Sequence, residues 1–148
     1  MDDPARMPSL EKIGSQCFCL HSRMAARTVT RRYNSVLASI GLEVTEFSLL
    51  AALAAGRHAS VTELAERLAF ERTTLVRNLK GMAKRGIIKR SEKTGRSVHY
   101  APTVRGNSLL KKALPLWEKA QASLTGKLRD QNAEGILASL HALRGASD

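Results

Sequence analysis

The chain has 148 residues, 43% of them apolar, with 10 Gly and 4 Pro, which is typical of a packed domain rather than a disordered chain. It carries 24 Lys and Arg against 13 Asp and Glu, a formal net charge of +11 that favours an anionic partner. The first residues lack the basic and apolar regions of a signal peptide, and no apolar run is long enough to span a bilayer. We therefore expect a cytoplasmic protein that does not bind membranes.

Residues 9–40 show the pattern of one long helix, preceded by a short lead that contains two prolines. The apolar positions at helical spacing are Leu10, Ile13, Cys17, Leu20, Met24, Val29, Tyr33, Val36, Leu37 and Ile40. A helix of about 30 residues spans about 45 Å, which exceeds the core of a small domain. We therefore expect part of this stripe to contact another chain, and Gly41 to end the helix.

Two shorter helices are predicted next. Thr45 is the expected N-cap of a compact helix, rich in Leu and Ala, that ends at Gly56. Ser60, followed three residues later by Glu63, forms a capping box, and the apolar residues after it repeat at the spacing of a short amphipathic helix ending near Leu68.

A turn through residues 69–71 leads to a second amphipathic run with two distinct faces. Its apolar stripe consists of Leu75, Leu79, Met82 and Ala83. The opposite face contains Thr73, Arg77, Lys80, Gly81 and Lys84, with Thr74 beside it. Such charge is most often an ordinary solvated face. A short helix, a tight turn and a second helix are, however, the order of a helix-turn-helix, whose second helix enters the major groove of DNA.

A β-hairpin is predicted after this helix. Gly86 ends the helix, a β-type run begins at Ile87, and residues 98–101 form the expected return strand. Lys93 and Arg96 lie near the tip of this wing, where two cations can enter a groove of DNA.

Most of the positive charge is concentrated in this region. Residues 67–96 contain ten Lys and Arg against two acids, which leaves +8 of the formal +11. Charge that serves solubility would be scattered, whereas a concentrated basic surface on a helix and a hairpin suits a phosphate backbone. Affinity for DNA should then fall steeply with salt, because counterions are released on binding.

Two further helices complete the chain. Thr103 is the expected cap of a long helix that runs to about Leu128, and Pro115 inside it should bend it. Asn132 is the expected cap of the last helix. The large apolar helices thus lie at both ends of the chain, outside the basic module.

The predicted fold class is mainly α with a small β-hairpin wing, a winged helix-turn-helix module flanked by terminal dimerisation helices. We expect residues 9–40 and 104–145 to form a helical dimerisation region and residues 45–103 to form the DNA-binding domain. A symmetric dimer would carry two such domains about 34 to 36 Å apart, one turn of DNA.

The order of these elements resembles the MarR family of bacterial transcription regulators. The residues that carry the resemblance are LAERLAFERTTLVRNLKGMAKRGIIKR at 64–90 and PTVRG at 102–106. The resemblance implies a homodimer that binds a pseudo-palindromic operator on double-stranded DNA, and we expect a repressor. Many family members release DNA when a small phenolic compound binds or a cysteine is oxidised, which implies a small aromatic effector or thiol oxidation here.

The resemblance also assigns DNA contacts by position. The residues expected to face bases and nearby phosphates are Arg72, Thr73, Thr74, Arg77 and Asn78; those expected to face the backbone are Lys80 and Lys84, and Arg96 would enter the minor groove. The chain departs from the family pattern twice. Thr94 replaces the acid that steadies the wing, and Ala69 replaces the usual glycine of the turn, where a left-handed backbone is more costly for alanine.

The two cysteines are candidates for redox sensing. Counted without gaps, Cys19, Arg23 and Tyr33 match the reactive cysteine, the arginine and the tyrosine of the family branch that senses organic hydroperoxides, whereas the second tyrosine of that branch falls at Val44. A sensor thiol must be partly thiolate, which a nearby cation favours. The alternative is inert burial of Cys17 and Cys19. On one continuous helix these two residues point about 200° apart, which would exclude a disulfide between them.

Other classes of function have weaker support. Cys17, Cys19 and His21 have the composition of a metal site but not the geometry, so no metal is expected. The sequence contains no phosphate-cradling Gly loop, nucleophile motif or paired carboxylates, so neither an enzyme nor a cofactor is expected. The alternative to an effector-controlled regulator is an architectural DNA-binding protein without an effector.

Overall fold

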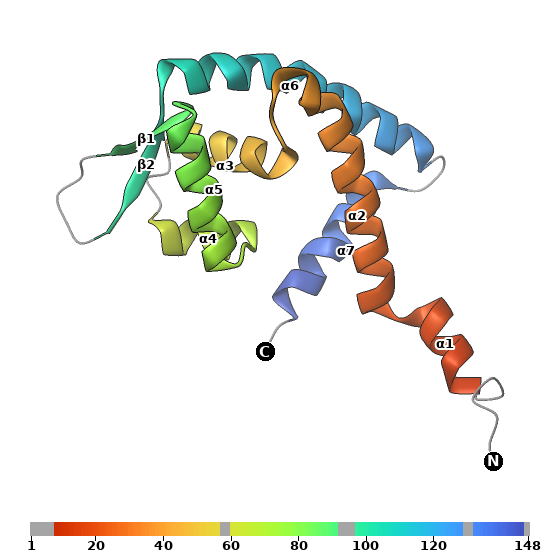
Figure 1. The fold of residues 1–148 in the computed structure, drawn as a ribbon. Helices are drawn as coiled ribbons and strands as arrows, with labels where there is room; N and C mark the ends of the chain where they lie inside the picture. Colours follow the sequence, from red (N-terminus) through yellow and green to blue (C-terminus); the bar gives the residue numbers. More distant parts are fainter. Residues whose placement is uncertain (1–7, 57–59, 92–96, 129–131, 147–148) are drawn as a thin grey trace.

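The computed structural model describes residues 8–56, 60–91, 97–128 and 132–146 of the chain. Its elements are α1 (Pro8–Gln16), α2 (Phe18–Leu37) with the 3-10 turn η2 (Ala38–Ile40), α3 (Val44–Ala54), α4 (Val61–Leu68), α5 (Arg72–Lys84), β1 (Ile88–Ser91), β2 (His99–Pro102), α6 (Val104–Lys127) and α7 (Ala133–Gly145). The predicted fold class is confirmed. The hairpin, α3, α4 and α5 lie on the side of the first half of α6, and α2 and α7 lie on the side of its second half, while α1 lies far from α6, beyond the N-terminal end of α2 (Figure 1).

The helix-turn-helix forms as its sequence predicts. The Ser60 hydroxyl accepts a hydrogen bond from the backbone N–H of Glu63 at 3.2 Å, and the Glu63 carboxylate accepts one from the N–H of Ser60 at 2.6 Å. These two bonds satisfy donors that the first turn of α4 leaves unpaired. The residue after α4, Ala69, adopts the left-handed conformation with φ +54°. Alanine thus occupies a turn position whose backbone conformation favours glycine.

The carboxylate of this capping box has a perturbed acidity. Hydrogen bonds from the backbone N–H and from the side chain of Ser60 are the main causes that hold the pKa of Glu63 below its ordinary value. Desolvation opposes these hydrogen bonds, and electrostatic interactions with His99 and Arg67, each weaker than the desolvation effect, lower this pKa further. The ionised form of Glu63 is therefore favoured in the folded chain.

Two apolar clusters hold the helices together. The first lies in the helix-turn-helix and contains Leu49, Leu50, Leu53, Leu64, Leu75, Leu79, Met82, Ile87 and Ile88. The second lies between α2, α3 and α6 and contains Leu37, Leu42, Phe47 and Ala113, with Trp117 packed against it. The ring centroids of Phe47 and Trp117 are 6.5 Å apart. Because α3 supplies buried residues to both clusters, it joins the helix-turn-helix to the long helices.

The start of α6 is locked to the start of the hairpin. The Thr103 hydroxyl accepts from the N–H of Gly106 at 3.0 Å, which confirms the predicted cap, and the N–H of Thr103 donates to the carbonyl of Ile87 at 3.0 Å. A Cβ atom at Gly106 would lie only 2.0 Å from that carbonyl oxygen. Glycine therefore allows the two backbones to approach each other here.

The prediction of one continuous helix over residues 9–40 is wrong. Cys17 has φ −72° and ψ 109°, an extended conformation that separates α1 from α2. Gly14 is a poor helix former, and the Ser15 hydroxyl donates to the carbonyl of Glu11 at 2.9 Å, in competition with regular helix bonding. The apolar spacing hid this break because it continues in phase on both sides of Cys17. Gly41 closes η2 with φ +69°, as expected.

The predicted N-cap at Thr45 is also wrong. Glu43 occupies the cap position, and Glu46 completes a capping box with it, so α3 begins at Val44. The side chain of Asn34, on α2, accepts from the N–H of Val44 at 2.7 Å. This partner from another helix satisfies the N–H of Val44, the first residue of α3.

The remaining boundaries lie close to their predictions. β1 pairs with β2 in antiparallel register, Ile88 opposite Pro102, so the return strand lies one residue later than expected. α6 continues through Pro115 as one helix, and its second half slopes away from the first (Figure 1). The Asn132 side chain caps α7 by accepting from the N–H of Glu134 at 3.0 Å.

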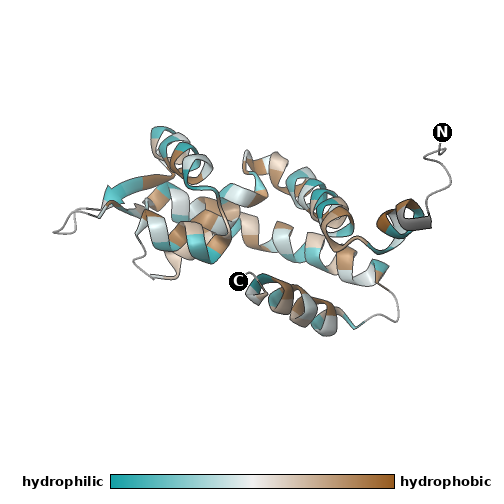
Figure 2. Ribbon diagram, turned by 90° about the horizontal axis from the view of Figure 1, so that it is seen from below, coloured by the Kyte–Doolittle hydropathy of each residue, from teal (hydrophilic) through white to brown (hydrophobic). Residues whose placement is uncertain are grey.

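Exposed apolar side chains gather on the terminal helices. The larger ones there are Leu10, Ile13, Phe18, Met24, Val29, Leu137, Leu140 and Leu143. Phe18 is 75% exposed, and α7 buries none of its residues. Figure 2 shows apolar residues along both the helix nearest the N-terminus and the helix that ends at the C-terminus. In the described ranges no single helix is long and apolar enough to cross a membrane; α2 with η2 passes such a test only jointly with α3, at a bend of 75°.

The left-handed Ala69 generates the first prediction. Replacing Ala69 by Gly should raise the free energy of unfolding by about 0.5 to 1 kcal/mol, because glycine removes the steric cost of this conformation. Urea denaturation followed by circular dichroism measures the change. Ala122→Gly, in the exposed interior of α6, is the matched control and should lower the free energy of unfolding by about 1 kcal/mol. A loss of stability in both variants would contradict the prediction.

The capping box of α4 generates a pH prediction. Because the pKa of Glu63 is lower in the folded than in the unfolded chain, the carboxylate stabilises the fold above the unfolded pKa, and this contribution is lost as the pH falls through the folded pKa. Glu63→Gln should therefore be less stable than wild type near neutral pH, and the difference should shrink as the pH falls below the unfolded pKa and through the lowered folded pKa of Glu63. Urea denaturation at a series of pH values tests this, with Glu66→Gln as an exposed control on the same helix. A difference that is independent of pH would reject it.

Candidate nucleic-acid interface

The core holds α5 by one face and leaves its basic face in solvent. Leu75, Leu79 and Met82 are fully buried in the first apolar cluster. On the other side of α5 the exposed residues are Thr73, Arg77, Lys80, Gly81 and Lys84, with the half-buried Thr74 and Asn78 beside them, and Arg72 is exposed in the first turn, on the edge toward α4. The structure therefore brings together the seven predicted DNA contacts of this helix on or beside one outward surface.

Few carboxylates neutralise the positive charge of this surface. Of the described cations in residues 67–96, Arg85 is the one that forms an ion pair, with Glu46 at 2.8 Å. The described cations of this window that form no ion pair with a described acid are Arg67, Arg72, Arg77, Lys80, Lys84, Lys89 and Arg90. Their charge is therefore available to an external anion.

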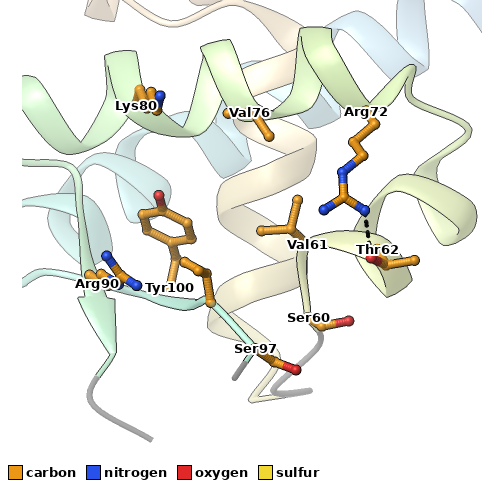
Figure 3. A pocket seen from close by; sticks show the side chains of 10 residues that line it. Ser60, Val61, Thr62, Arg72, Val76, Lys80, Arg90, Ser97 and Tyr100 are labelled. Carbon is orange, nitrogen blue, oxygen red and sulfur yellow. Dashed lines mark hydrogen bonds between the residues drawn. The ribbon is translucent and has the colours of Figure 1, made fainter. Parts of the chain in front are cut away.

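A pocket of about 400 Å³ lies between α5, the start of α4 and the hairpin (Figure 3). Its lining combines three cations with hydroxyl groups and apolar side chains. The residues are Ser60, Val61, Thr62, Arg72, Val76, Lys80, Arg90, Ser97, Val98 and Tyr100. A second hollow on α5 itself shares Arg72, Val76 and Lys80 with it and adds Thr73 and Arg77. The basic surface is thus concave and extends from α5 to the hairpin.

Arg72 does not project freely from α5. Its Nη1 atom donates to the hydroxyl of Thr62 at 3.1 Å, so the side chain points toward α4 (Figure 3). Thr62 therefore fixes the direction of one predicted DNA contact. Sequence reasoning assigned no role to Thr62, because the contact crosses the turn between the two helices.

The hairpin contributes residues that sequence reasoning missed. Arg90 stands opposite Tyr100 in the strand register, and both line the pocket beside α5. The sequence indicated Arg90 only as one of the cations of residues 67–96. Its position opposite Tyr100 depends on the pairing register of the two strands, which the sequence alone does not determine. The predicted wing contacts, Lys93 and Arg96, lie outside the described residues, as does Thr94.

The redox candidates are not brought together within one chain. Cys19 is exposed and Cys17 is half-buried, both as free thiols. Tyr33 is buried in α2, and its hydroxyl donates to the side-chain oxygen of Gln121 on α6. Fourteen residues of helix separate Cys19 from Tyr33, about 21 Å along the axis. Arg23 is exposed on the same helix.

Two points of geometry near the cysteines change the sequence interpretation. Because the helix is interrupted at Cys17, the argument that a continuous helix keeps Cys17 and Cys19 apart does not hold. The His21 ring is hydrogen-bonded to the carbonyl of Gly14 at 2.9 Å across the break. In the described part of the chain, no three His, Cys, Asp or Glu side chains come together as metal ligands.

Burial raises the pKa of Tyr33, which keeps the phenol protonated and able to donate its hydrogen bond to Gln121. The neighbouring Arg32 donates from Nη2 to the hydroxyl of Ser123 at 2.9 Å. Two adjacent residues of α2 are thus bonded to α6. Tyr33 has a structural contact in this chain that is independent of any cysteine chemistry.

A basic helix seated on a helix-turn-helix core beside a β-hairpin defines a winged helix-turn-helix protein of the DNA-binding class. The sequence profile of the MarR family matches residues 40–97. No match was found among curated protein sequences. The transcriptional regulator MosR of M. tuberculosis, solved in complex with DNA, is 32% identical, covers 88% of this chain and 96% of its own, and superposes with a TM-score of 0.80. The chain belongs to the MarR family of transcriptional regulators.

Other solved regulators have the same fold. The transcriptional repressor CouR, bound to a 23-mer DNA duplex, is 25% identical with a TM-score of 0.79, over 88% of this chain and 94% of its own. CouR has also been solved with p-coumaroyl-CoA. A mutant MarR of E. coli, complexed with operator DNA, is 16% identical with a TM-score of 0.74, over 93% of this chain and 98% of its own.

Proposed function

We propose that this chain is a homodimeric repressor that binds a pseudo-palindromic operator and releases it in response to thiol oxidation or a small aromatic ligand. The observation that carries the proposal is the outward basic face of α5, which continues into the concave surface beside the hairpin. MosR and CouR, which are similar to this chain, have been solved in complex with DNA, which supports DNA as the partner.

The residues of α5 divide by their position on the helix. Thr73, Arg77 and the half-buried Thr74 and Asn78 belong to the face proposed to read base edges. The residues proposed to contact phosphates are Arg72, oriented by Thr62, and Lys80, Lys84 and Arg90. Lys93 and Arg96 of the wing are also proposed to contact DNA, Arg96 in the minor groove. Phosphate contacts fix the position of the protein on the duplex, whereas base contacts supply sequence preference.

The terminal helices are proposed to form the dimer interface, which comprises residues 9–40 and 104–145, with residues 45–103 as the DNA-binding domain. The apolar side chains of α1, α2 and α7 that remain exposed in one chain support this division. Contiguous exposed apolar surface marks a site of association. Light scattering should give twice the mass of one chain at the concentrations used for DNA binding.

Sequence preference is tested by removing Arg77. DNA selected by wild type from a randomised library supplies the operator, and Arg77→Ala should weaken binding to it by about 1 to 3 kcal/mol while binding to random DNA changes little. Lys84→Ala should instead weaken binding to the operator and to random DNA equally, and it should reduce the number of counterions released on binding by about one. Lys119→Ala, an exposed cation of α6, is the control for charge. Unchanged operator affinity in Arg77→Ala would reject the assignment.

The oxidation response is tested at Cys19. We expect its thiolate to attack a hydroperoxide, so that sulfur takes one oxygen as a sulfenic acid while the O–O bond breaks and water or an alcohol leaves. Stoichiometric peroxide should then reduce operator binding by wild type but not by Cys19→Ser, with Cys17→Ser as the matched variant. Equal peroxide sensitivity of wild type and both variants would exclude these thiols as sensors.

The ligand response is separable from oxidation. An aromatic carboxylate such as p-coumarate, or its coenzyme A thioester, should raise the melting temperature and release DNA equally well in wild type and Cys19→Ser. An architectural DNA-binding protein would respond to neither treatment and would bind selected and random DNA alike.

A further inference from the structure

Arg85, the first residue after α5, connects the end of this helix to the corner between α2 and α3. Its Nη1 atom donates to Oε1 of Glu46 at 2.8 Å, and its Nη2 atom donates to the carbonyl oxygen of Gly41. The Glu46 side chain is only 16% exposed, whereas that of Arg85 is 41% exposed. One guanidinium therefore holds two acceptors that lie about forty residues earlier in the chain.

The same carboxylate is bound on its other side. Oε2 of Glu46 accepts from the N–H of Glu43 at 3.2 Å, as part of the capping box of α3. The next N–H, that of Val44, donates to the Asn34 side chain of α2 at 2.7 Å. Asn34, Glu46 and Arg85 thus form a continuous series of contacts from α2, through the start of α3, to the end of α5, which we call the α2–α5 link.

The α2–α5 link constrains the orientation of α5 relative to α2, which apolar packing alone does not fix. Burial of Leu75, Leu79 and Met82 keeps α5 on the core, but apolar packing is not directional. A guanidinium held by two acceptors in fixed positions is directional, because its donors lie in one plane. The link therefore restricts the angle between α5 and α2.

We propose that Arg85 is a positioning residue that acts through Glu46 to set the distance between the two DNA-reading helices of the dimer, without contacting DNA itself. The inference rests on the proposed function, since α2 lies in the proposed dimer interface and α5 in the proposed DNA interface. In a symmetric dimer, the angle between these helices determines which spacing of half-sites the protein accepts. Loss of the link should then relax the choice of operator length.

The test compares operators of three lengths. Wild type is presented with its selected operator and with versions lengthened or shortened by one base pair at the centre, which moves one half-site by about 3.4 Å and turns it by about 35°. We expect wild type to bind the altered operators at least about tenfold more weakly than the selected one. Affinities are measured by fluorescence anisotropy at several salt concentrations.

Two variants break the link from opposite sides. Glu46→Gln and Arg85→Met should each bind the selected operator about tenfold more weakly, because binding must then order a less restricted helix. Their preference for the selected length over the altered lengths should fall to within about threefold. Arg85→Lys keeps the charge and loses the planar fork, so it should show the same relaxed preference with an unchanged salt dependence. Lys84→Met is the matched control, because it removes a cation of α5 outside the link and should weaken all three operators equally.

The result for Glu46 is the most discriminating. Simple electrostatics predicts tighter DNA binding when an acid is removed, whereas the α2–α5 link predicts weaker and less length-selective binding. If Glu46→Gln binds as tightly as wild type with the same preference, and Arg85→Met weakens all three lengths with a reduced salt dependence, Arg85 is a phosphate contact and the inference is wrong while the proposed function stands. If wild type selects no operator, the proposed function fails and the inference fails with it. Circular dichroism melting confirms that each variant is folded.

Discussion

The seating of α5 on the apolar core is the constraint on which the rest of this structure depends. Leu75, Leu79 and Met82 occupy one face of the helix and have no exposed surface. Because the side chains of a helix follow a fixed angular order, burial of this stripe directs Arg77 and Lys80 outward. The arrangement that places cations where DNA can reach them is therefore set by residues that contact no nucleic acid.

The second feature is the connection between this helix and the long helices, which the apolar side chains of α3 provide. Phe47 packs with Leu37 and Ala113, while Leu49 and Leu50, only two and three residues later, belong to the cluster around α5. The domain boundary predicted near residue 45 therefore falls within α3, whose side chains belong to both apolar clusters. A displacement of the long helices would therefore reach the core beneath α5 through the side chains of α3.

The sequence predicted those features that depend on neighbouring residues. The capping box at Ser60, the apolar stripe of α5 and the cap at Thr103 involve partners three or four positions away, and each was found where it was expected. The break at Cys17 was missed because periodicity records phase and not continuity. The start of α3 was missed because Asn34 reaches it from another helix.

The candidate site divides in the same way. The exposed residues of α5 follow from helical spacing, whereas Thr62, Arg85 and Arg90 acquire their roles from contacts between elements. The roles of these three residues could be assigned only from the folded structure. They depend on a turn between two helices, on an ion pair across about forty residues and on a strand register. The resemblance of residues 64–90 to the MarR family located the helix but said nothing of the side chains that orient it.

Gly106 has a consequence for how the molecule can move. The carbonyl oxygen of Ile87 occupies the place where any side chain at this position would lie, so a slip of α6 by one residue in either direction would drive Arg105 or Asn107 into the backbone of the hairpin. α6 therefore cannot slide along its own axis where Gly106 meets Ile87. Any relative movement of the long helix and the wing must therefore leave this point of closest approach in place.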